Sequence, residues 1–489
     1  MAPACGIEFS DFGFNAAVAN PDGSTQMAVD EVGGNWPAFA AWDGAQLVFG
    51  REAEQISRLK PRAVSNVFWE HLSLSPSDLQ GPPRVPAYSE LAYAFLKGFW
   101  EDLVVRAGRP ECVALAIPGQ ILGNVEGDSP GVGLILAMAR DLQIPLTNIS
   151  GLSTASLNDP ESVAGLAAGR VLYLDLHLHS AAMSLLASDG EGNMVRRRHL
   201  RLPRLGYVPL INGLLRTMGN RFLRATAFDI TAQRGLDQAF YDQTREQLLS
   251  ASKGNDIRYS IETASRVHQA AFPREALLRD LAPLEQGWAD SAVKFLREGS
   301  LAPKDVTVVV STRVRLLPAM EDVLQQRGFA RIVRLREGAA ARGAARFAAG
   351  LEPCAEMTDV PLLSEVALSK AAAAGTGQAL EVAHLAAAYP TPGLMPSHLV
   401  VDGAAYSLHA LPPMLQAADG ATDPAIPSLA RIGGVEIALR REAGEWQIDV
   451  PASGAGSLQV ATGDRVRVRA NGAEVELLIA AERRPGAVA

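Results

Sequence analysis

The stretch GIEFSDFGFNAAVANPDG (residues 6–23) has a counterpart one domain further along the chain, GRVLYLDLHLHSAAMSLLASDGEG (residues 169–192). In each, a short apolar run ends at an acidic residue, Glu8 or Asp175, and a turn, a second apolar run and an Asp-Gly turn follow. Apolar runs bounded by such turns are typical of β-hairpins. We therefore predict a chain built as two related halves, each of which offers a carboxylate and a turn to a shared cleft.

The two hairpins resemble the phosphate-binding hairpins of the actin, sugar-kinase and heat-shock-chaperone ATPase superfamily. The flanking sequence is most similar to the DnaK-type heat-shock chaperones, over roughly the first 350 residues. Further stretches resemble chaperone elements in the same order, at residues 36–56, 111–120, 139–157, 305–326 and 342–352. The resemblance implies an α/β fold with two actin-like, ribonuclease-H-like lobes, a helical subdomain and a small C-terminal all-β domain.

The resemblance and the local patterns together divide the chain into four parts. We expect lobe I at residues 1–165 and lobe II at residues 166–388, with an almost wholly helical insertion at about 205–300. Residues 389–396 contain the sequence PTPGLMP, which is typical of a linker. Residues 397–489 alternate apolar and polar side chains between glycine turns, which predicts an antiparallel β domain.

Strands alternating with helices predict an α/β layer within the lobes. We expect strands at 112–117 and 145–149, and helices at about 130–142, 153–168 and 317–326. Residues 361–388 also have a helical pattern, broken at a Gly-Thr-Gly sequence. A helix at 89–107 is indicated by Leu91, Phe95, Phe99 and Leu103, which recur at helical spacing.

Composition and charge exclude several classes of protein. The net charge of −8 gives no broad attraction for nucleic acid or for an anionic membrane surface. Cys5, Cys112 and Cys354 lie far apart without CxxC spacing, which argues against a disulfide framework or a zinc ribbon and fits a reducing compartment. Because no signal peptide or long apolar run is evident, we expect a cytoplasmic protein with neither a membrane nor a nucleic-acid partner.

One basic run stands out at residues 196–201, with the sequence RRRHLR. It could bind an acidic partner, or it could form the solvated arm of a hairpin. The simpler interpretation is the solvated arm.

Phosphoryl transfer requires backbone N–H groups close to the phosphates, a cation, and Mg²⁺ held by carboxylates. In the resembled family, the first hairpin carries an Asp followed by a Gly-Thr-Thr turn. At the corresponding positions this chain has Glu8, which is one methylene longer, and Phe12, which is bulky where the turn should be small. The first hairpin therefore keeps a carboxylate but departs from the phosphate-binding turn.

The second hairpin departs further from the family pattern of Asp, Leu, three glycines, Thr and a second Asp. Asp175 keeps the first Asp, whereas His177 and His179 stand within the glycine stretch. Ser180 takes the place of the Thr, and Ala182 replaces the second Asp. Two imidazole rings would therefore fill the space that a β- or γ-phosphate uses.

Positions elsewhere in the chain differ as well. His71 stands where the family has its catalytic Lys, and Gly151 aligns with the Glu at the crossing between the lobes. The Gly-Gly of the adenosine loop is replaced by Val309 and Val310. The sequence that follows this loop still resembles the family.

The resemblance implies two sets of site residues. The catalytic candidates, all altered or doubtful relative to the family, are Asp175, Glu8 and His71. The candidates for binding a nucleotide are Asp11, Gly13, Ser180, Ser311, Thr312 and Arg313. ATP or ADP with Mg²⁺ therefore stays open as a ligand, and no resident metal is predicted.

The loss of one oxyanion-type donor costs on the order of a hundredfold in rate. Loss of the cation, a carboxylate and the glycines together should leave little hydrolysis. We therefore expect a pseudo-ATPase that binds a protein partner as an interaction or scaffold module. An active but divergent Mg-ATP-dependent chaperone is the alternative. A small-molecule kinase of the same superfamily is a third hypothesis, against which Ala182 speaks.

A rebuilt metal site is a further alternative for the second hairpin. Asp175, His177 and His179 alternate, so on a strand all three side chains would point to one face. Such a set is an acceptable partial shell for Zn²⁺ or another divalent ion. Otherwise the two histidines fill a collapsed cleft, hydrogen-bonded to Asp175 or to the backbone. His71 likewise has two interpretations, as a general base or as a packing residue.

Overall fold

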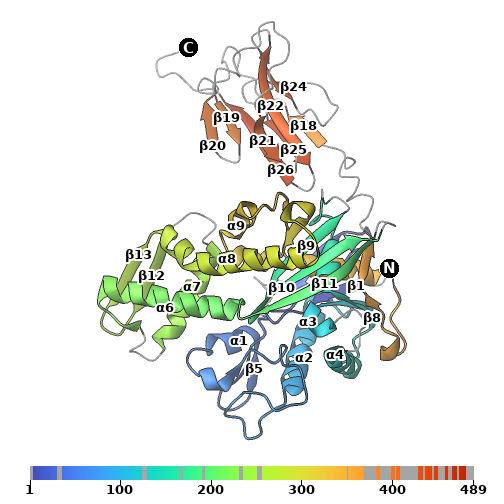
Figure 1. Ribbon diagram of the computed structural model, residues 1–489, viewed down its shortest axis with the longest axis vertical. Coiled ribbons are helices and arrows are strands. Elements are labelled where there is room, and N and C mark those ends of the chain that lie inside the picture. The colour runs from blue at the N-terminus through green and yellow to red at the C-terminus, as the bar shows by residue number, and fades with distance from the viewer. Residues whose placement is uncertain are drawn as a thin grey trace. The chain divides into compact units, whose positions relative to one another are not determined.

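The computed structural model describes residues 4–29, 36–123, 129–164, 166, 169–189, 193–230, 235–250, 256–349 and 351–367, together with the strand backbones given below for the C-terminal part. The chain divides into two compact units, residues 1–368 and residues 369–489. The first unit is an α/β structure with two mixed six-stranded sheets, as predicted for the fold class (Figure 1).

The first sheet is built around the N-terminal hairpin. β1 pairs antiparallel with β2, and β2 with β3, while β7, β8 and β16 extend the sheet in parallel from the other side of β1. The spatial order is β16-β8-β7-β1-β2-β3. The bounds are β1 Ala4–Glu8, β2 Asn15–Ala19, β3 Thr25–Val29, β7 Cys112–Ile117, β8 Leu146–Gly151 and β16 Leu362–Leu363.

The second sheet repeats this arrangement around the second hairpin. β9 pairs antiparallel with β10, β10 with β11, and β11 with the short β17, while β14 and β15 continue in parallel from β9. The bounds are β9 Arg170–Leu176, β10 Ser180–Ser188, β11 Asn193–Pro203, β14 Thr307–Val310, β15 Ile332–Arg334 and β17 Glu365–Ala367. Both sheets therefore share an antiparallel three-stranded meander whose first strand is followed outward by two parallel strands from later in the chain, and they differ in the sixth strand, which is the parallel β16 in one and the antiparallel β17 in the other.

Helices and short strands cover the first sheet. The helix α2 (Tyr88–Ala107) buries the predicted stripe of Leu91, Phe95, Phe99 and Leu103 in the same apolar cluster as β1, β7 and β8. A small sheet of β4 (Ala40–Trp42), β5 (Leu47–Phe49) and β6 (Val64–Ser65) precedes it, and α1 (Gly50–Gln55) lies between β5 and β6 in the chain. The remaining helices of this half are α1 (Gly50–Gln55), α3 (Gly119–Leu122), α4 (Pro130–Asp141) and α5 (Leu152–Leu157).

The alanine-rich helix α10 (Ala339–Ala349) returns from the second half of the unit to pack on β1, β2, β7 and α5. A Cβ atom on Gly6 would lie 2.1 Å from the carbonyl oxygen of Ala341, and one on Gly343 would lie 1.7 Å from that of Ala155. Backbones this close leave room only for glycine at both positions. Main-chain contact between α10, β1 and α5 therefore joins the two halves.

The segment predicted as almost wholly helical contains a β-hairpin. Its helices are α6 (Tyr207–Thr226), α7 (Leu236–Ser250) and α8 (Arg274–Glu298), and Figure 1 shows them grouped with the hairpin beside the second sheet. Between α7 and α8, β12 (Ile257–Glu262) pairs antiparallel with β13 (Val267–Phe272). The residues of β12 alternate between buried and exposed, a period of two that overrides the helical expectation.

Three further local predictions were wrong in extent or in type. The helix expected at 153–168 ends at Leu157, because Pro160 disfavours the helical conformation of the residue before it. The helix expected from Leu317 begins at Met320, as α9 (Met320–Gln326), after a 3₁₀ turn. Residues 361–388 include the strands β16, β17 and β18 (Glu381–Leu385) rather than one helical stretch.

The described residues of the second unit are strands. A five-stranded antiparallel sheet has the order β18-β25-β26-β19-β20, and a four-stranded one has the order β21-β22-β23-β24. The bounds are β19 His398–Val401, β20 Ala404–Ser407, β21 Ser428–Ile432, β22 Val435–Glu442, β23 Glu445–Asp449, β24 Leu458–Val460, β25 Arg465–Ala470 and β26 Ala473–Ala480. The linker predicted at 389–396 lies outside the described residues. Among the helices described, none has the length and apolar character needed to cross a bilayer.

The contact between α10 and α5 makes Gly343 a sensitive position. We expect Gly343→Ala to lower the free energy of unfolding by about 3 kcal/mol, because the added methyl group meets main chain that cannot rotate away. The matched control is Gly133→Ala in α4, where an added Cβ meets nothing within 4 Å and should stabilise by up to about 1 kcal/mol. Urea denaturation measures both, and equal effects would contradict the proposed close packing.

Candidate functional site

The two hairpins bring their carboxylates to adjacent strand ends. Glu8 is the last residue of β1, and Asp175 lies one residue before the end of β9. β14 runs parallel to β9 and ends at Val310, so the segment that follows, from Ser311 onward, emerges beside Asp175. The N–H of Ser311 donates to the carbonyl of Leu174, which fixes this segment against β9.

Arg313 bridges the two carboxylates. Its Nη1 lies 2.5 Å from Glu8 Oε1, while Nε and Nη2 donate to the two oxygens of Asp175 at 3.0 and 2.8 Å. The exposed fraction is 4% for Glu8, 1% for Asp175 and 2% for Arg313, so all three charges are removed from water. A planar guanidinium group thus binds one carboxylate in bidentate fashion and holds a second one at its far edge.

Polar neighbours complete the coordination of both carboxylates. The hydroxyl of Ser311 donates to Asp175 Oδ1 at 2.6 Å, and the Asn15 amide donates to Glu8 Oε2 at 3.3 Å. Burial opposes ionisation of Asp175, but Arg313 and the hydrogen bonds outweigh it and lower the pKa of this carboxyl group. Asp175 is therefore an anion whose charge is neutralised by the chain itself.

The backbone of the second hairpin turn is also satisfied internally. The N–H of Leu178 donates to Asp11 Oδ1 at 3.1 Å, so a carboxylate from the first hairpin takes the donor that the turn presents. His177 lies between Asp11 and Asp175, with Nδ1 at 3.3 Å from Asp11 Oδ1 and Nε2 at 3.7 Å from Asp175 Oδ2. Burial lowers the pKa of His177, but Asp175 and Asp11 overcome this effect, and the net shift is upward.

The carbonyl groups of the same turn are occupied by the chain that follows β11. Arg204, Tyr207 and Val208 donate their N–H groups to the carbonyls of His179, His177 and Leu178 in turn. Gly206 passes so close that a Cβ there would lie 2.3 Å from the nitrogen of Ser180. Ser180, predicted as a nucleotide-binding residue, is buried at the start of β10 under this segment.

His179 and His71 lie apart from the bridged carboxylates. β9 ends at Leu176, so residues 177–179 form a turn, and the expected alternation that would place both histidines with Asp175 on one face is wrong. His179 Nε2 instead lies 3.2 Å from both the carbonyl and the side-chain oxygen of Asn66. His71 is exposed and packs against Tyr88. Within the described part of the chain, no three His, Cys, Asp or Glu side chains gather in a way that could hold a metal.

Most side chains of the basic run at 196–201 are partly buried, and the run does not form the expected solvated arm. Arg198 stacks on the ring of Phe295 and pairs with Glu298, and Arg201 pairs with Glu70. His199 is neutral, because burial, with nearby Arg196, lowers its pKa to about 4. Arg197 is the exposed member of the run.

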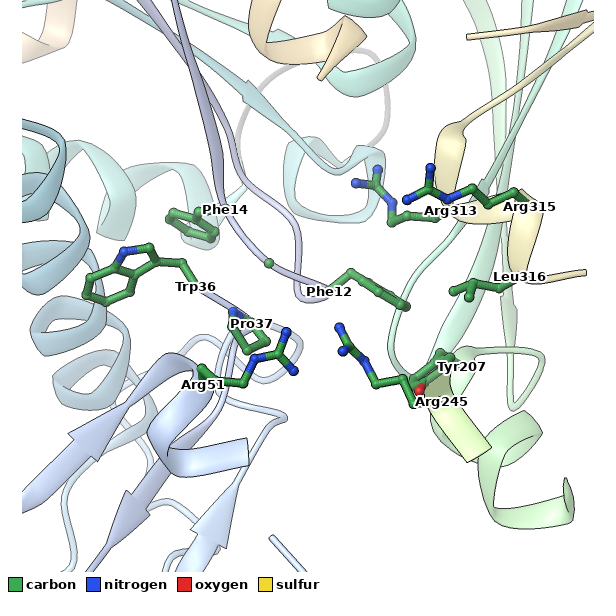
Figure 2. Close-up of a pocket in the computed structure, with 11 residues that line it drawn as sticks. Phe12, Phe14, Trp36, Pro37, Arg51, Tyr207, Arg245, Arg313, Arg315 and Leu316 are labelled. Carbon is green, nitrogen blue, oxygen red and sulfur yellow. The ribbon is translucent and has the colours of Figure 1, made fainter. Parts of the chain in front are cut away.

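A cavity of about 170 Å³ lies beside Arg313 (Figure 2). Its walls combine arginines with aromatic rings and come from both halves of the unit. Gly13, a predicted nucleotide-binding residue, lines it at a backbone φ of +154°, whereas Thr312 does not. The lining residues are Phe12, Gly13, Phe14, Trp36, Pro37, Arg51, Tyr207, Arg245, Arg313, Arg315 and Leu316.

Sequence reasoning missed the opposite wall of this cavity. Arg51 of α1 pairs with Glu54, whose Oε1 also lies 3.7 Å from Arg245 Nε and accepts a hydrogen bond from the Tyr241 hydroxyl at 3.0 Å. Arg51 and Arg245 are separated by nearly two hundred positions and lie in two helices, α1 and α7, without a recognisable motif. The sequence feature that could have indicated this wall was Glu54, an acidic residue on the helix that follows the β4–β5 pair.

No protein-family model matches this chain, and a search of curated proteins likewise finds no match. The functional interpretation therefore depends on the geometry of the site.

The buried charge cluster predicts a strong effect of removing its cation. We expect Arg313→Met to lower the free energy of unfolding by about 3–5 kcal/mol, because two buried carboxylates lose their partner. Adding Glu8→Gln and Asp175→Asn to this variant should recover part of the loss, since no uncompensated charge remains. Arg334→Gln is the control, an exposed ion pair with Glu321 that should change stability by less than about 1 kcal/mol. Urea denaturation at neutral pH measures all four proteins, and no recovery in the triple variant would contradict the charge argument.

His177 predicts a pH-dependent contribution to stability. Its pKa is raised in the folded protein, so its contribution is fully present below the ordinary value of about 6.5 and is lost as pH rises through the higher folded pKa. The difference in unfolding free energy between the wild type and His177→Gln should therefore be larger at about pH 5.5 than at about pH 8.5. The exposed His71→Gln serves as the control, and a difference independent of pH for His177→Gln would count against ion pairing with Asp11 and Asp175.

Proposed function

We propose that this chain is a pseudo-ATPase with the two-lobed, actin-like fold of the heat-shock chaperones, and that it acts as a protein-interaction or scaffold module. The observation that carries the proposal is the buried bridge from Glu8 through Arg313 to Asp175. On this assignment, the two carboxylates of the phosphate-binding hairpins are neutralised by a side chain instead of a metal–nucleotide complex.

The repeated sheet order supports the fold part of the proposal. Two mixed sheets that share a five-strand order, each starting from a hairpin with an acidic residue near the end of its first strand, are expected of duplicated ribonuclease-H-like lobes. The helical segment α6–α8, with its β-hairpin, would then be the subdomain of the second lobe. The two antiparallel sheets of residues 369–489 would take the place of the C-terminal β domain.

The interactions of the turns support loss of catalysis. Phosphoryl transfer needs free backbone donors and a metal between the hairpins. Here the N–H of Leu178 is taken by Asp11, and the carboxylate of Asp175 is taken by Arg313 and Ser311. A triphosphate could enter only if several buried hydrogen bonds broke together.

The alternative is an active, divergent Mg-ATP-dependent chaperone, and the cavity beside Arg313 is the observation that favours it. Nucleotide there would require Arg313 to leave Glu8 and Asp175 and so expose both carboxylates to Mg²⁺. The two hypotheses therefore differ in whether Mg-ATP binding moves Arg313.

Turnover and binding of Mg-ATP test the proposal. We expect the full chain to hydrolyse ATP no faster than a blank, and millimolar Mg-ATP to leave its melting temperature unchanged. Ligand at a hundred times its Kd would stabilise the folded state by about 2.7 kcal/mol, so an unchanged temperature places the Kd for Mg-ATP in the millimolar range or above. A DnaK-type chaperone assayed in parallel is the positive control. Magnesium-dependent turnover that disappears in Asp175→Asn would refute the proposal and establish the alternative.

A further inference from the structure

The cavity beside Arg313 has one strongly basic side. Figure 2 shows the guanidinium groups of Arg51 and Arg245 directed toward each other across the cavity, away from Arg313 and Arg315. Arg51 belongs to α1 and Arg245 to α7, so the two groups come from segments far apart in the chain. Both side chains keep about a quarter of their surface exposed, which leaves them open to a ligand.

The acidic partners of these two arginines do not line the cavity. Glu54, which is 3% exposed, interacts with both arginines and accepts the hydrogen bond of Tyr241. Tyr241 stays neutral, because burial raises the pKa of its hydroxyl well above the ordinary value. Of the described residues that line the cavity, none is acidic. Asp242 also interacts electrostatically with Arg51 and Arg245. Neither Glu54 nor Asp242 lines the cavity, so the charged groups that these elements present to it are the two guanidinium groups.

An apolar surface adjoins this charge. Phe12 projects into the cavity and meets the ring of Tyr207 edge to face, with centroids 5.0 Å apart. Burial raises the pKa of Tyr207 to about 12, so it too is neutral. The cavity volume of about 170 Å³ is below the roughly 300–1,000 Å³ of pockets for drug-sized ligands. The space suits a small molecule that is anionic at one end and apolar at the other.

We propose that this cavity binds a small organic anion, whose carboxylate or phosphoryl group lies between Arg51 and Arg245 and whose apolar body packs on Phe12 and Tyr207. Arginine pairs recognise such groups through charge-assisted, bidentate hydrogen bonds. The ligand needs neither a nucleotide nor a metal, so this site is independent of the proposed loss of ATPase activity. Because the arginines belong to α1 and α7, the bound anion also ties these two segments together.

Calorimetric titration of the full chain at low ionic strength, without ATP or Mg²⁺, tests the proposal. The probes are benzoate for a carboxylate and phenyl phosphate for a phosphoryl group, with benzyl alcohol as the neutral control. At least one anion should bind with a submillimolar Kd, while benzyl alcohol should not bind, and the stronger anion identifies the group. Failure of both anions, or equal binding of benzyl alcohol, would overturn the proposal whatever the outcome of the ATPase assays.

Variants locate the site. Arg51→Gln and Arg245→Gln should each weaken binding of the better anion at least tenfold, since each removes one charge-assisted contact. Arg327→Gln is the matched control, because its ion pair with Asp290 involves neither α1 nor α7 and should leave the Kd unchanged. Phe12→Ala keeps both arginines and should also weaken binding, which preserves the test if an arginine variant does not fold. Binding unchanged in the folded variants would place the anion elsewhere and overturn the proposal.

Discussion

The buried guanidinium group of Arg313 is the constraint on which the centre of this molecule depends. Charges removed from water cost several kcal/mol each unless partners compensate them, so Glu8, Asp175 and Arg313 must be buried together or not at all. Glu8 belongs to the first sheet and Asp175 to the second, and the cation therefore fixes the distance between two strand ends that are not paired with each other. Replacing a buried ion cluster by apolar residues is often neutral for stability, so we interpret this cluster as fixing a defined arrangement rather than adding net stability.

This arrangement explains why the features around the cluster are satisfied from within. Asp11 accepts the Leu178 N–H and lies beside His177, while the segment 204–208 covers the carbonyls of the same turn. Space and hydrogen bonds that a diffusible ligand would need are thus already used. The cavity lies next to this region, and Arg51 and Arg245 line it while their acidic partners Glu54 and Asp242 do not. On the proposed pseudo-ATPase assignment, loss of phosphoryl transfer is therefore compatible with survival of a cavity beside the bridged carboxylates.

Local patterns predicted the hairpins, the stripe of α2 and the α/β class, because alternation and helical spacing follow from burial of one face. They failed where the local structure depends on a contact between residues that are far apart in the sequence. Arg313 is paired with residues 138 and 305 positions away, so the sequence could show an altered hairpin but not the cation that neutralises it. The turn at 177–179 was mistaken for strand because its geometry depends on Gly206 and Tyr207, which approach from beyond β11. Arg51 and Arg245 were missed for the same reason.

Two of the connections between the halves differ in what could release them. The packing of α10 on β1 and α5 rests on main-chain contact at Gly6 and Gly343, which no change in pH or ligand would alter. The cluster at the strand ends rests on charge, so protonation or a competing cation could weaken it in principle. Compensation by Arg313 is intramolecular, however, and a group fixed by the chain does not dissociate as a bound ion does. If the fold is that of a two-lobed ATPase, closure that normally depends on a ligand has become a permanent property of the sequence. A molecule of that kind has a constant surface to offer a partner.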